Sequence, residues 1–321
     1  MGNLWNIGRP LPPIDPARLP GKGRPDWVQA DERFINEALG RARARENGGW
    51  VVLDASRKIT GQPRKFVVDG REWVAWRVGD EVRTAPNDCP HMGAPMCEGR
   101  VQNGDLVCPW HGLKLGKRAH GSWVPVPAFD DGVLVWARIL TNETPTERPF
   151  LTPRPDRFLD GVVSMPAVCE PEDVVANRLD PWHGTHFHPH SFATLTVTGV
   201  VDDALLVRVA YRVVANVVVE VDCQFHAPTR RSIVMTITDG DGKGSVVETH
   251  ATPIGPGRST MIEATLAWSD RIGFPWMFAV RDWVRPMIER RAERLWIEDV
   301  AYAERRYAVR TRQLAMQPTP A

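Results

Sequence analysis

Hydrophobic and polar positions alternate in short runs over residues 50–84, and the runs are separated by turn residues. The runs 50–54, 64–70 and 71–84 have the period of about two that favours β-strands. The pairs Asp69-Gly70 and Gly79-Asp80 lie between such runs and predict hairpin turns. Two further runs, at 121–129 and 132–140, have the same character. Residues 48–140 are therefore predicted to form a small antiparallel β domain.

The segments on either side of this domain have a different pattern. Residues 1–30 are rich in proline and glycine and predict an extended arm. Residues 31–47 have an acidic start and a basic end, which suits the helix dipole, and Gly48-Gly49 should end that helix. We expect an N-terminal arm and helix over 1–47 and a proline-rich linker over 141–155.

The second half, residues 156–321, predicts strands and then a long helix. A strand-like run at 164–170 and a helix over 171–186 come first, followed by β-rich stretches at 194–225, 230–240, 245–254 and 259–269. A helical pattern over 283–312 comes near the end of the chain. This order is typical of an antiparallel sheet with helices packed against it. The predicted fold class is α+β, with the small antiparallel β domain in front of this larger domain.

Composition narrows the classes of function and location. The 321 residues carry a formal net charge of +1, which favours neither a nucleic acid nor a membrane surface as partner. The most apolar stretch, 204–221, contains Arg208, Arg212 and Glu220, so no membrane span is expected. The first residues have neither a basic nor an apolar signal-peptide region. This absence and an odd number of cysteines, five, predict a cytoplasmic protein.

Two Cys/His pairs in the predicted β domain have the spacing of a metal site. Cys89 and His91 are followed after sixteen residues by Cys108 and His111. A [2Fe–2S] cluster with two cysteines on one iron and two histidines on the other is a Rieske centre. Zinc is the rival, because two cysteines and two histidines also suit tetrahedral Zn²⁺. Zinc fingers, however, usually pair cysteine with cysteine and histidine with histidine, which favours the cluster here.

The residues around these pairs resemble the two cluster loops of the Rieske non-haem iron oxygenase family. The segments are His91-Met92-Gly93-Ala94-Pro95 and Cys108-Pro109-Trp110-His111-Gly112. Respiratory Rieske proteins carry an additional cysteine in each loop, and this chain has Ala94 and Trp110 at those places. Leu113 departs from the aromatic residue that often follows His-Gly in the oxygenases. Cys97 has no partner nearby in the sequence and is interpreted as a small apolar residue.

A second histidine cluster, His183, His186, His188 and His190, follows an acidic residue in the second half. His186 and His190 have the i, i+4 spacing of one helical face, but Pro189 should interrupt that helix. His183 and His188 are about 140° apart on a regular helix and could converge only at a bulge or break. Spacing alone leaves open which pair could bind a metal.

The family resemblance selects one pair. Asp180, His183 and His188 match the mononuclear-iron motif of the Rieske oxygenases, and Asn177 also fits. The usual glutamate beside that asparagine is Ala176 here. The resemblance covers about residues 48–310 and implies that His183 and His188 bind Fe(II). His186 and His190 are then interpreted as helix and pocket-wall residues.

The resemblance also implies a carboxylate ligand from a late helix, often within a Glu-Asp pair. Glu298 and Asp299 form such a pair in the last predicted helix. Asp299 falls on the apolar stripe of that helix, where an unpaired carboxylate is costly, so it is the predicted third ligand. Glu298 follows Arg294 by one turn and is interpreted as a surface ion-pair residue.

The family resemblance further implies a function and partners. Asp180 is expected to orient His183 and to pass electrons to it from the cluster ligand His111 of a neighbouring subunit in a homotrimer. The chain would then be an oxygenase component that uses O₂, a [2Fe–2S] cluster and mononuclear Fe(II) on a small, apolar organic substrate. A separate reductase or ferredoxin would supply electrons, because no nucleotide-binding fingerprint is evident in the chain. The alternative is a Rieske electron carrier whose second site is not functional.

Two further observations concern the type of oxygenase and its pocket. The chain length and the run 248–253 look more like the homo-oligomeric monooxygenase and demethylase branch than the larger dioxygenases. Phe225, His250 and Trp268 are candidates for the pocket wall, although ordinary packing is the simpler interpretation of each.

Overall fold

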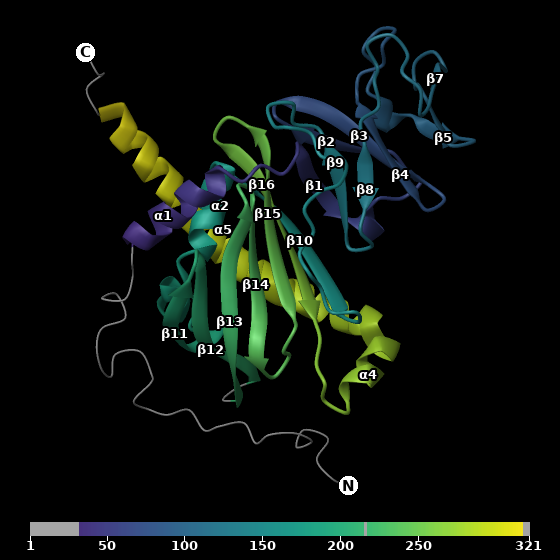
Figure 1. Ribbon diagram of the computed structural model, residues 1–321. Helices are drawn as coiled ribbons and strands as arrows, with labels where there is room; N and C mark the ends of the chain where they lie inside the picture. Colours follow the sequence, from purple (N-terminus) through teal and green to yellow (C-terminus); the bar gives the residue numbers. More distant parts are fainter. Residues whose placement is uncertain (1–31, 215–216, 317–321) are drawn as a thin grey trace.

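The computed structural model describes residues 32–214 and 217–316, which form two β-rich halves and a long helix (Figure 1). The predicted α+β class is confirmed: all paired strands in these residues are antiparallel, and the long helix lies against the larger sheet. The predicted arm over residues 1–30 lies outside the described residues. The domain boundaries proposed at 48, 140 and 155 stay predictions.

Three small three-stranded sheets make up the first half. Their strands, in spatial order within each sheet, are β1 (Trp50–Ala55), β9 (Leu134–Arg138) and β8 (Ala128–Asp130); β2 (Arg64–Val68), β3 (Arg71–Val78) and β4 (Glu81–Pro86); and β5 (Arg100–Gln102), β6 (Asp105–Val107) and β7 (Lys114–Leu115). Both predicted hairpins are present. Val68 pairs with Arg71 across the first turn, and Val78 pairs with Glu81 across the second.

A seven-stranded antiparallel sheet dominates the second half. Its strands in spatial order are β10 (Leu159–Ala167), β16 (Arg258–Ala267), β15 (Val246–Gly255), β14 (Ser232–Gly240), β13 (Val217–Thr229), β12 (Ala204–Val214) and β11 (Phe192–Val201). Consecutive strands from β11 to β16 are neighbours, and β10 closes the far edge beside β16.

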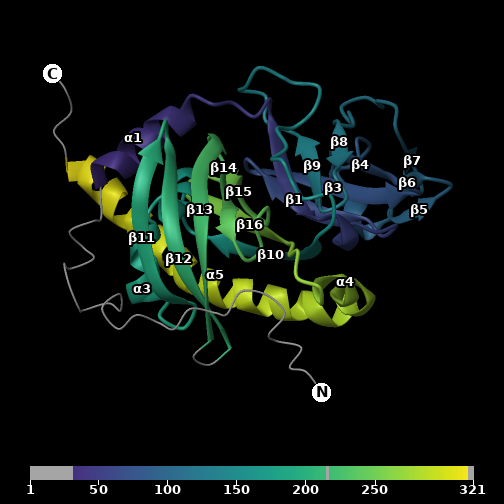
Figure 2. The same ribbon diagram turned by 60° about the horizontal axis from the view of Figure 1, so that its bottom comes forward.

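The two faces of this sheet meet different partners because side chains alternate along each strand. In β16, Ile262 and Ala264 pack with Trp50 and Trp136 of the first half. Met261, one residue away, packs with Trp296 of the long helix. The first half therefore covers one face of the sheet, and the helix lies along the other (Figures 1 and 2).

The helices are α1 (Glu32–Arg43), α2 (Pro171–Arg178), α3 (Gly184–Phe187), α4 (Phe274–Met277) and α5 (Arg281–Met316). The helix predicted over 31–47 ends four residues early. The N–H groups of Ala44 and Arg45 donate to carbonyls three residues back, and that of Asn47 donates to the Glu143 carboxylate at 2.9 Å. No helix of the described residues is long and apolar enough to cross a membrane.

Buried ion pairs fix α2 against α5 and the sheet. Asp173 of α2 is fully buried and accepts two hydrogen bonds of 2.8 Å from Arg310 of α5. Glu263 of β16 accepts from Trp296 of α5 at 2.7 Å and pairs with Arg178 at the end of α2. Because three elements meet at these charges, the residues at the end of α2 and in the middle of α5 have a defined separation.

Candidate functional site

The two Cys/His loops have matching backbone geometry at one end of the first half. The N–H of Cys89 donates to Ala94 O at 2.9 Å, and that of Cys108 donates to Leu113 O at 2.8 Å. Gly93 and Gly112 each donate back to the cysteine carbonyl of their own loop, and both have φ of 74°. Only glycine adopts this left-handed conformation without strain, which explains the glycine in each loop.

The four predicted cluster ligands come together at the tip of these loops. Cys89 and Cys108 are buried, whereas His91 and His111 are exposed, with ring centroids 4.8 Å apart. Burial raises the pKa of Cys89. Burial would also raise that of Cys108, but backbone N–H groups and the neighbouring thiol lower it overall. Amide groups directed at the sulfurs suit thiolate ligands, and the exposed imidazoles suit electron exchange at the surface.

A break in the predicted helix 171–186 creates the second site. The helix ends at Arg178, and Asp180 has φ −111° and ψ 74°, because the following Pro181 disfavours the helical conformation. A 3₁₀ turn, Pro181–His183, and the short helix α3 then reach His188. The continuous helix was therefore a wrong prediction, and the break is what allows His183 and His188 to face the same point.

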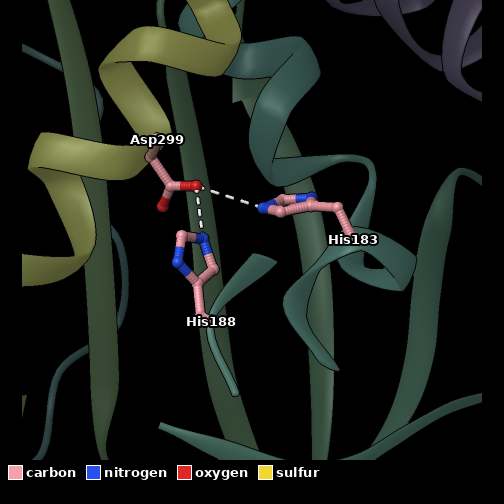
Figure 3. A group of neighbouring side chains, drawn as sticks. All are labelled: His183, His188 and Asp299. Atoms are coloured by element: carbon pink, nitrogen blue, oxygen red, sulfur yellow. Dashed lines mark hydrogen bonds and ion pairs between the residues drawn. The ribbon is translucent and has the colours of Figure 1, made fainter. Parts of the chain in front are cut away.

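Three predicted ligands meet between this break and α5 (Figure 3). Asp299 Oδ1 lies 3.1 Å from Nε2 of His183 and 2.8 Å from Nε2 of His188. One potential ligand atom from each of the three residues lies within 4.8 Å of the others. His188 and Asp299 are buried, at 1% and 2% exposed, and His183 is partly buried.

This donor set fits a divalent metal ion. Two ligand atoms about 2.1 Å from a cation and at right angles to each other are about 3 Å apart, close to both observed contacts. Burial alone would raise the pKa of Asp299, but hydrogen bonds from His183 and His188 hold it well below its usual range. The carboxylate is therefore ionised. Two imidazoles and one carboxylate are the ligands typical of non-haem Fe(II) sites with open positions.

Contacts behind the imidazoles fix their orientation. His183 Nδ1 contacts the backbone carbonyl of Asp180, and His188 Nδ1 lies 2.5 Å from Glu298 Oε2. A carbonyl and a carboxylate can only accept, so both Nδ1 atoms carry hydrogen, and a bound metal would replace the hydrogen that each Nε2 donates to Asp299. Asn177 of α2 donates to Asp299 Oδ1 at 2.9 Å.

Glu298 is therefore not the surface ion-pair residue predicted from its spacing to Arg294. Its side chain is 35% exposed and contacts His188, with His190 Nε2 at 3.9 Å. Neighbouring positions on α5 can both reach His188 because its ring presents one nitrogen to each carboxylate. This contact could not be predicted from the sequence, since it depends on where His188 lies after the helix break.

Asp180 has a second partner that the sequence did not reveal. Tyr302 OH donates to Asp180 Oδ2 at 2.9 Å, and the Tyr302 ring stacks on His183 with centroids 5.1 Å apart. Asp180 Oδ1 is buried without a hydrogen-bond partner among the described residues. The carboxylate lies 3.9 Å from His183 Nδ1, so the backbone carbonyl of Asp180, and not its side chain, takes the bond from that ring.

The remaining candidates are divided between the cavity and the core. Phe225 lines the cavity beside the metal-ligand candidates. His250 is buried, packs on Trp136 and hydrogen-bonds Ser232, while Trp268 packs on Phe274. His186 is exposed on α3, and His190 is partly buried near His188. Neither of these two histidines lines the cavity.

A cavity of about 280 Å³ opens directly on the donor set. His183, His188 and Asp299 form part of its wall. The rest of the wall is mostly apolar and includes Phe192, Leu195, Val209, Phe225, Met235 and Val247. Of the other charged groups at the wall, Arg178 and Glu263 pair with each other, and Arg291 is the third. A small apolar molecule would fit beside the donors.

Comparison with known families assigns both halves of the chain. Residues 49–138 match the family described as Rieske [2Fe-2S] domain, and residues 140–314 match the one described as Domain of unknown function (DUF5914). The chain belongs to the DUF5914 family. The Rieske match in this DUF5914 protein decides between cluster and zinc in favour of the [2Fe–2S] cluster.

Curated relatives match the DUF5914 protein only in part. It is 31% identical over 94 residues to aminopyrrolnitrin oxygenase PrnD of Pseudomonas fluorescens, which is 29% of this chain and 25% of the relative. It is 36% identical over 69 residues to the vanillate O-demethylase oxygenase subunit of a Pseudomonas species, 21% of this chain and 19% of the relative. The matches thus span a quarter or less of the length of these two relatives.

Solved structures show a shared fold over nearly the whole chain. Dicamba monooxygenase bound to 3,6-dichlorosalicylic acid matches with a TM-score of 0.66 at 18% identity, over 86% of this chain and 92% of that one. The terminal oxygenase of carbazole 1,9a-dioxygenase from Nocardioides aromaticivorans matches with a TM-score of 0.61 at 14% identity, over 91% of this chain and 94% of that one. The resemblance to the Rieske non-haem iron oxygenases is confirmed in the Rieske domain and in the fold.

Proposed function

We propose that this DUF5914 protein is the oxygenase component of a Rieske non-haem iron oxygenase that hydroxylates or dealkylates a small apolar substrate. Its ligands would be Cys89, His91, Cys108 and His111 for the cluster, and His183, His188 and Asp299 for Fe(II). The observation that carries the proposal is the apolar cavity whose wall contains those last three side chains. A carrier of electrons alone has no need of a substrate cavity at its second site.

Fe(II) in such a site supplies O₂ binding and activation, and the cluster supplies electrons one at a time. The chain's own residues hold and orient these groups. Glu298 and the Asp180 carbonyl set the two imidazoles, and Asn177 holds Asp299 through a 2.9 Å hydrogen bond. The apolar wall excludes water from the space beside the ligands and places the substrate there.

Electrons would enter from a neighbouring copy of the chain in a homotrimer. The cluster loops lie at the β5–β7 tip, at the opposite end of the molecule from α3 (Figure 2), so transfer within one chain would have to cross the whole fold. Asp180 suits the role of a bridge because Tyr302 holds its Oδ2 and its side chain is 14% exposed, three residues before His183. The proposed donor to this carboxylate is the cluster ligand His111 of another copy.

Iron content distinguishes an oxygenase from an electron carrier. Protein loaded with iron and sulfide under anaerobic conditions should contain three irons per chain, and Asp299→Ala should contain two. Glu293→Ala, an exposed position on the same helix, is the matched control and should keep three. Two irons per chain in the wild-type protein would support an electron carrier and contradict the oxygenase proposal.

The substrate, the electron donor and the cytoplasmic location complete the proposal. No disulfide joins any of the five cysteines, all of which lie in the described residues, in keeping with a reducing compartment. One carbazole 1,9a-dioxygenase structure is a complex of oxygenase and ferredoxin, which supports a separate electron donor here. A screen of apolar compounds with a surrogate reductase, following O₂ consumption and product mass, would identify substrates. Electron flow without any substrate-dependent O₂ uptake would contradict the proposal.

A further inference from the structure

The segment from Ile272 to Met287 exposes large apolar side chains to solvent. Trp276 is 77% exposed, Trp283 81% and Met287 67%. Ile272, at 70%, and Val280, at 45%, extend the same surface. Single exposed apolar residues are ordinary, but a contiguous group of this kind marks a surface that contacts something apolar.

These side chains form one stripe along a helical path. Trp276, Val280, Trp283 and Met287 are spaced by four, three and four residues, which places them on a single face. The opposite face is packed: the Phe274 ring contacts those of Trp268 and Phe278, with centroids 5.6 Å apart in each pair. The segment is therefore held by its inner face, and its outer face, which we call the outer stripe, is apolar as well.

The outer stripe ends next to residues that line the cavity. Ile288 and Arg291 line the cavity, and they follow Met287 by one and four residues on α5. The α4 segment and the start of α5 stand out at the edge of the fold (Figure 1). An apolar molecule approaching along the outer stripe would reach the cavity wall within one helical turn.

Basic residues outnumber acidic ones in the segment that carries the outer stripe. Residues 270–294 contain six arginines and four carboxylates, a net charge of +2, although the whole chain has only +1. Arg281, Arg290 and Arg294 are exposed, and no described carboxylate lies within ion-pair distance of them. Arginines beside exposed tryptophans are typical of helices that lie in the interface of a lipid bilayer.

We propose that the outer stripe is a docking surface for a bilayer that contains anionic lipid, from which an apolar substrate enters the cavity. Lipid fits this surface better than a protein groove because the stripe is a convex helix face that carries two exposed indoles and continues along α5 into the exposed Arg290 and Arg294. The entry of substrate rests on the proposed function, whereas lipid binding does not. The nearly neutral overall charge gave no sign of this surface because it averages over a local basic cluster.

Flotation with lipid vesicles tests the inference on the iron-loaded full-length protein. The wild-type protein should float with vesicles of phosphatidylcholine and phosphatidylserine at low ionic strength, and less with phosphatidylcholine alone. The double variant Trp276→Ser/Trp283→Ser should bind about tenfold or more weakly, because two indoles no longer leave water. Arg281→Ser/Arg290→Ser should lose about fivefold per arginine on anionic vesicles.

The matched control replaces apolar residues exposed elsewhere. Phe150 and Val200 are 48% and 50% exposed, and Phe150→Ser/Val200→Ser should float like the wild-type protein. Absence of flotation in the wild-type protein, or equal flotation of the tryptophan variant, would overturn the inference. So would a changed molar mass of that variant in light scattering, which would make the outer stripe a contact between copies. Iron content decides the oxygenase proposal separately from all these results.

Discussion

Glu298 Oε2 lies 2.5 Å from Nδ1 of His188, on the far side of the imidazole from Asp299. Two consecutive residues of α5 thus hold one ring, one carboxylate at each nitrogen. His183 has a different support, the backbone carbonyl of Asp180. A substitution can remove the Glu298 side chain but not the backbone carbonyl of Asp180. The contact between Glu298 and His188 is therefore the one through which the orientation of a ligand ring can be tested.

Replacing Glu298 should weaken iron binding without removing a ligand. Loss of a partner behind a ligating histidine typically costs about 10–100-fold in metal affinity, and Glu298→Ala should fall in this range. Glu298→Gln keeps an accepting oxygen and should lose less. Iron retained during dialysis against graded chelator concentrations measures the change, with Glu293→Gln on the same helix as control. If Glu298→Ala retains iron as well as the wild-type protein, the carboxylate has no role in orienting His188.

Asp180 and Tyr302 should affect electron delivery and not metal content. Asp180→Asn should leave both metals bound and stop substrate-dependent O₂ uptake. Tyr302→Phe removes one hydrogen bond to Asp180 Oδ2 and should slow oxidation of the reduced cluster about tenfold, the equivalent of one hydrogen bond. Stopped-flow absorbance of the cluster in a single turnover measures this rate. An unchanged rate of cluster oxidation in Asp180→Asn would contradict the role of Asp180 as the bridge for electrons.

Local sequence patterns predicted the elements whose stabilising contacts are between residues close together in the sequence. Hairpins at Asp69-Gly70 and Gly79-Asp80 follow from turn residues between alternating runs, and the long helix α5 follows from its periodicity. The early end of α1 could not be predicted, because the Glu143 carboxylate that takes the Asn47 N–H is 96 residues away.

The same distinction holds for the site. The motif residues His183 and His188 could be named from the sequence only by resemblance, since their convergence needs the break at Asp180-Pro181. Asp299 could be separated from Glu298 by its apolar neighbours on the helix. The contact of Glu298 with His188 and that of Tyr302 with Asp180 join segments more than 100 residues apart. Tyr302 does lie one turn after Asp299, which is the one local sign that it could reach the site.

Reducing the cavity should change which substrates are accepted. Ala292 of α5 lines the cavity, and Ala292→Leu adds three carbon atoms to its wall. Larger compounds from an apolar panel should lose O₂ uptake first, while iron content stays at the wild-type level. Ala301→Leu, the same change at an exposed position of the same helix, is the control. An identical substrate range in Ala292→Leu and the wild-type protein would place the substrate elsewhere.

The Glu143–Arg231 ion pair should make folding sensitive to acid. Although burial raises the pKa of Glu143, hydrogen bonds from Arg231 and two backbone amides lower it to about 2, from an ordinary 4.5. A depressed folded-state pKa means that this stabilisation is present above about pH 4.5 and is lost as the pH falls toward 2. Its size at neutral pH is about 3 kcal/mol.

The variant Glu143→Gln should therefore be less stable at neutral pH and should show a weaker loss of stability between pH 4.5 and 2. Arg231 is 8% exposed, so this variant leaves a buried guanidinium unpaired, and Glu143→Gln/Arg231→Met should recover part of the loss. Urea unfolding followed by tryptophan fluorescence at several pH values measures both effects. A parallel acid dependence in wild type and Glu143→Gln would show that other carboxylates govern acid unfolding. Glu248, whose pKa the Arg154 guanidinium lowers to about 2 against the effect of burial, would then be the first alternative to test.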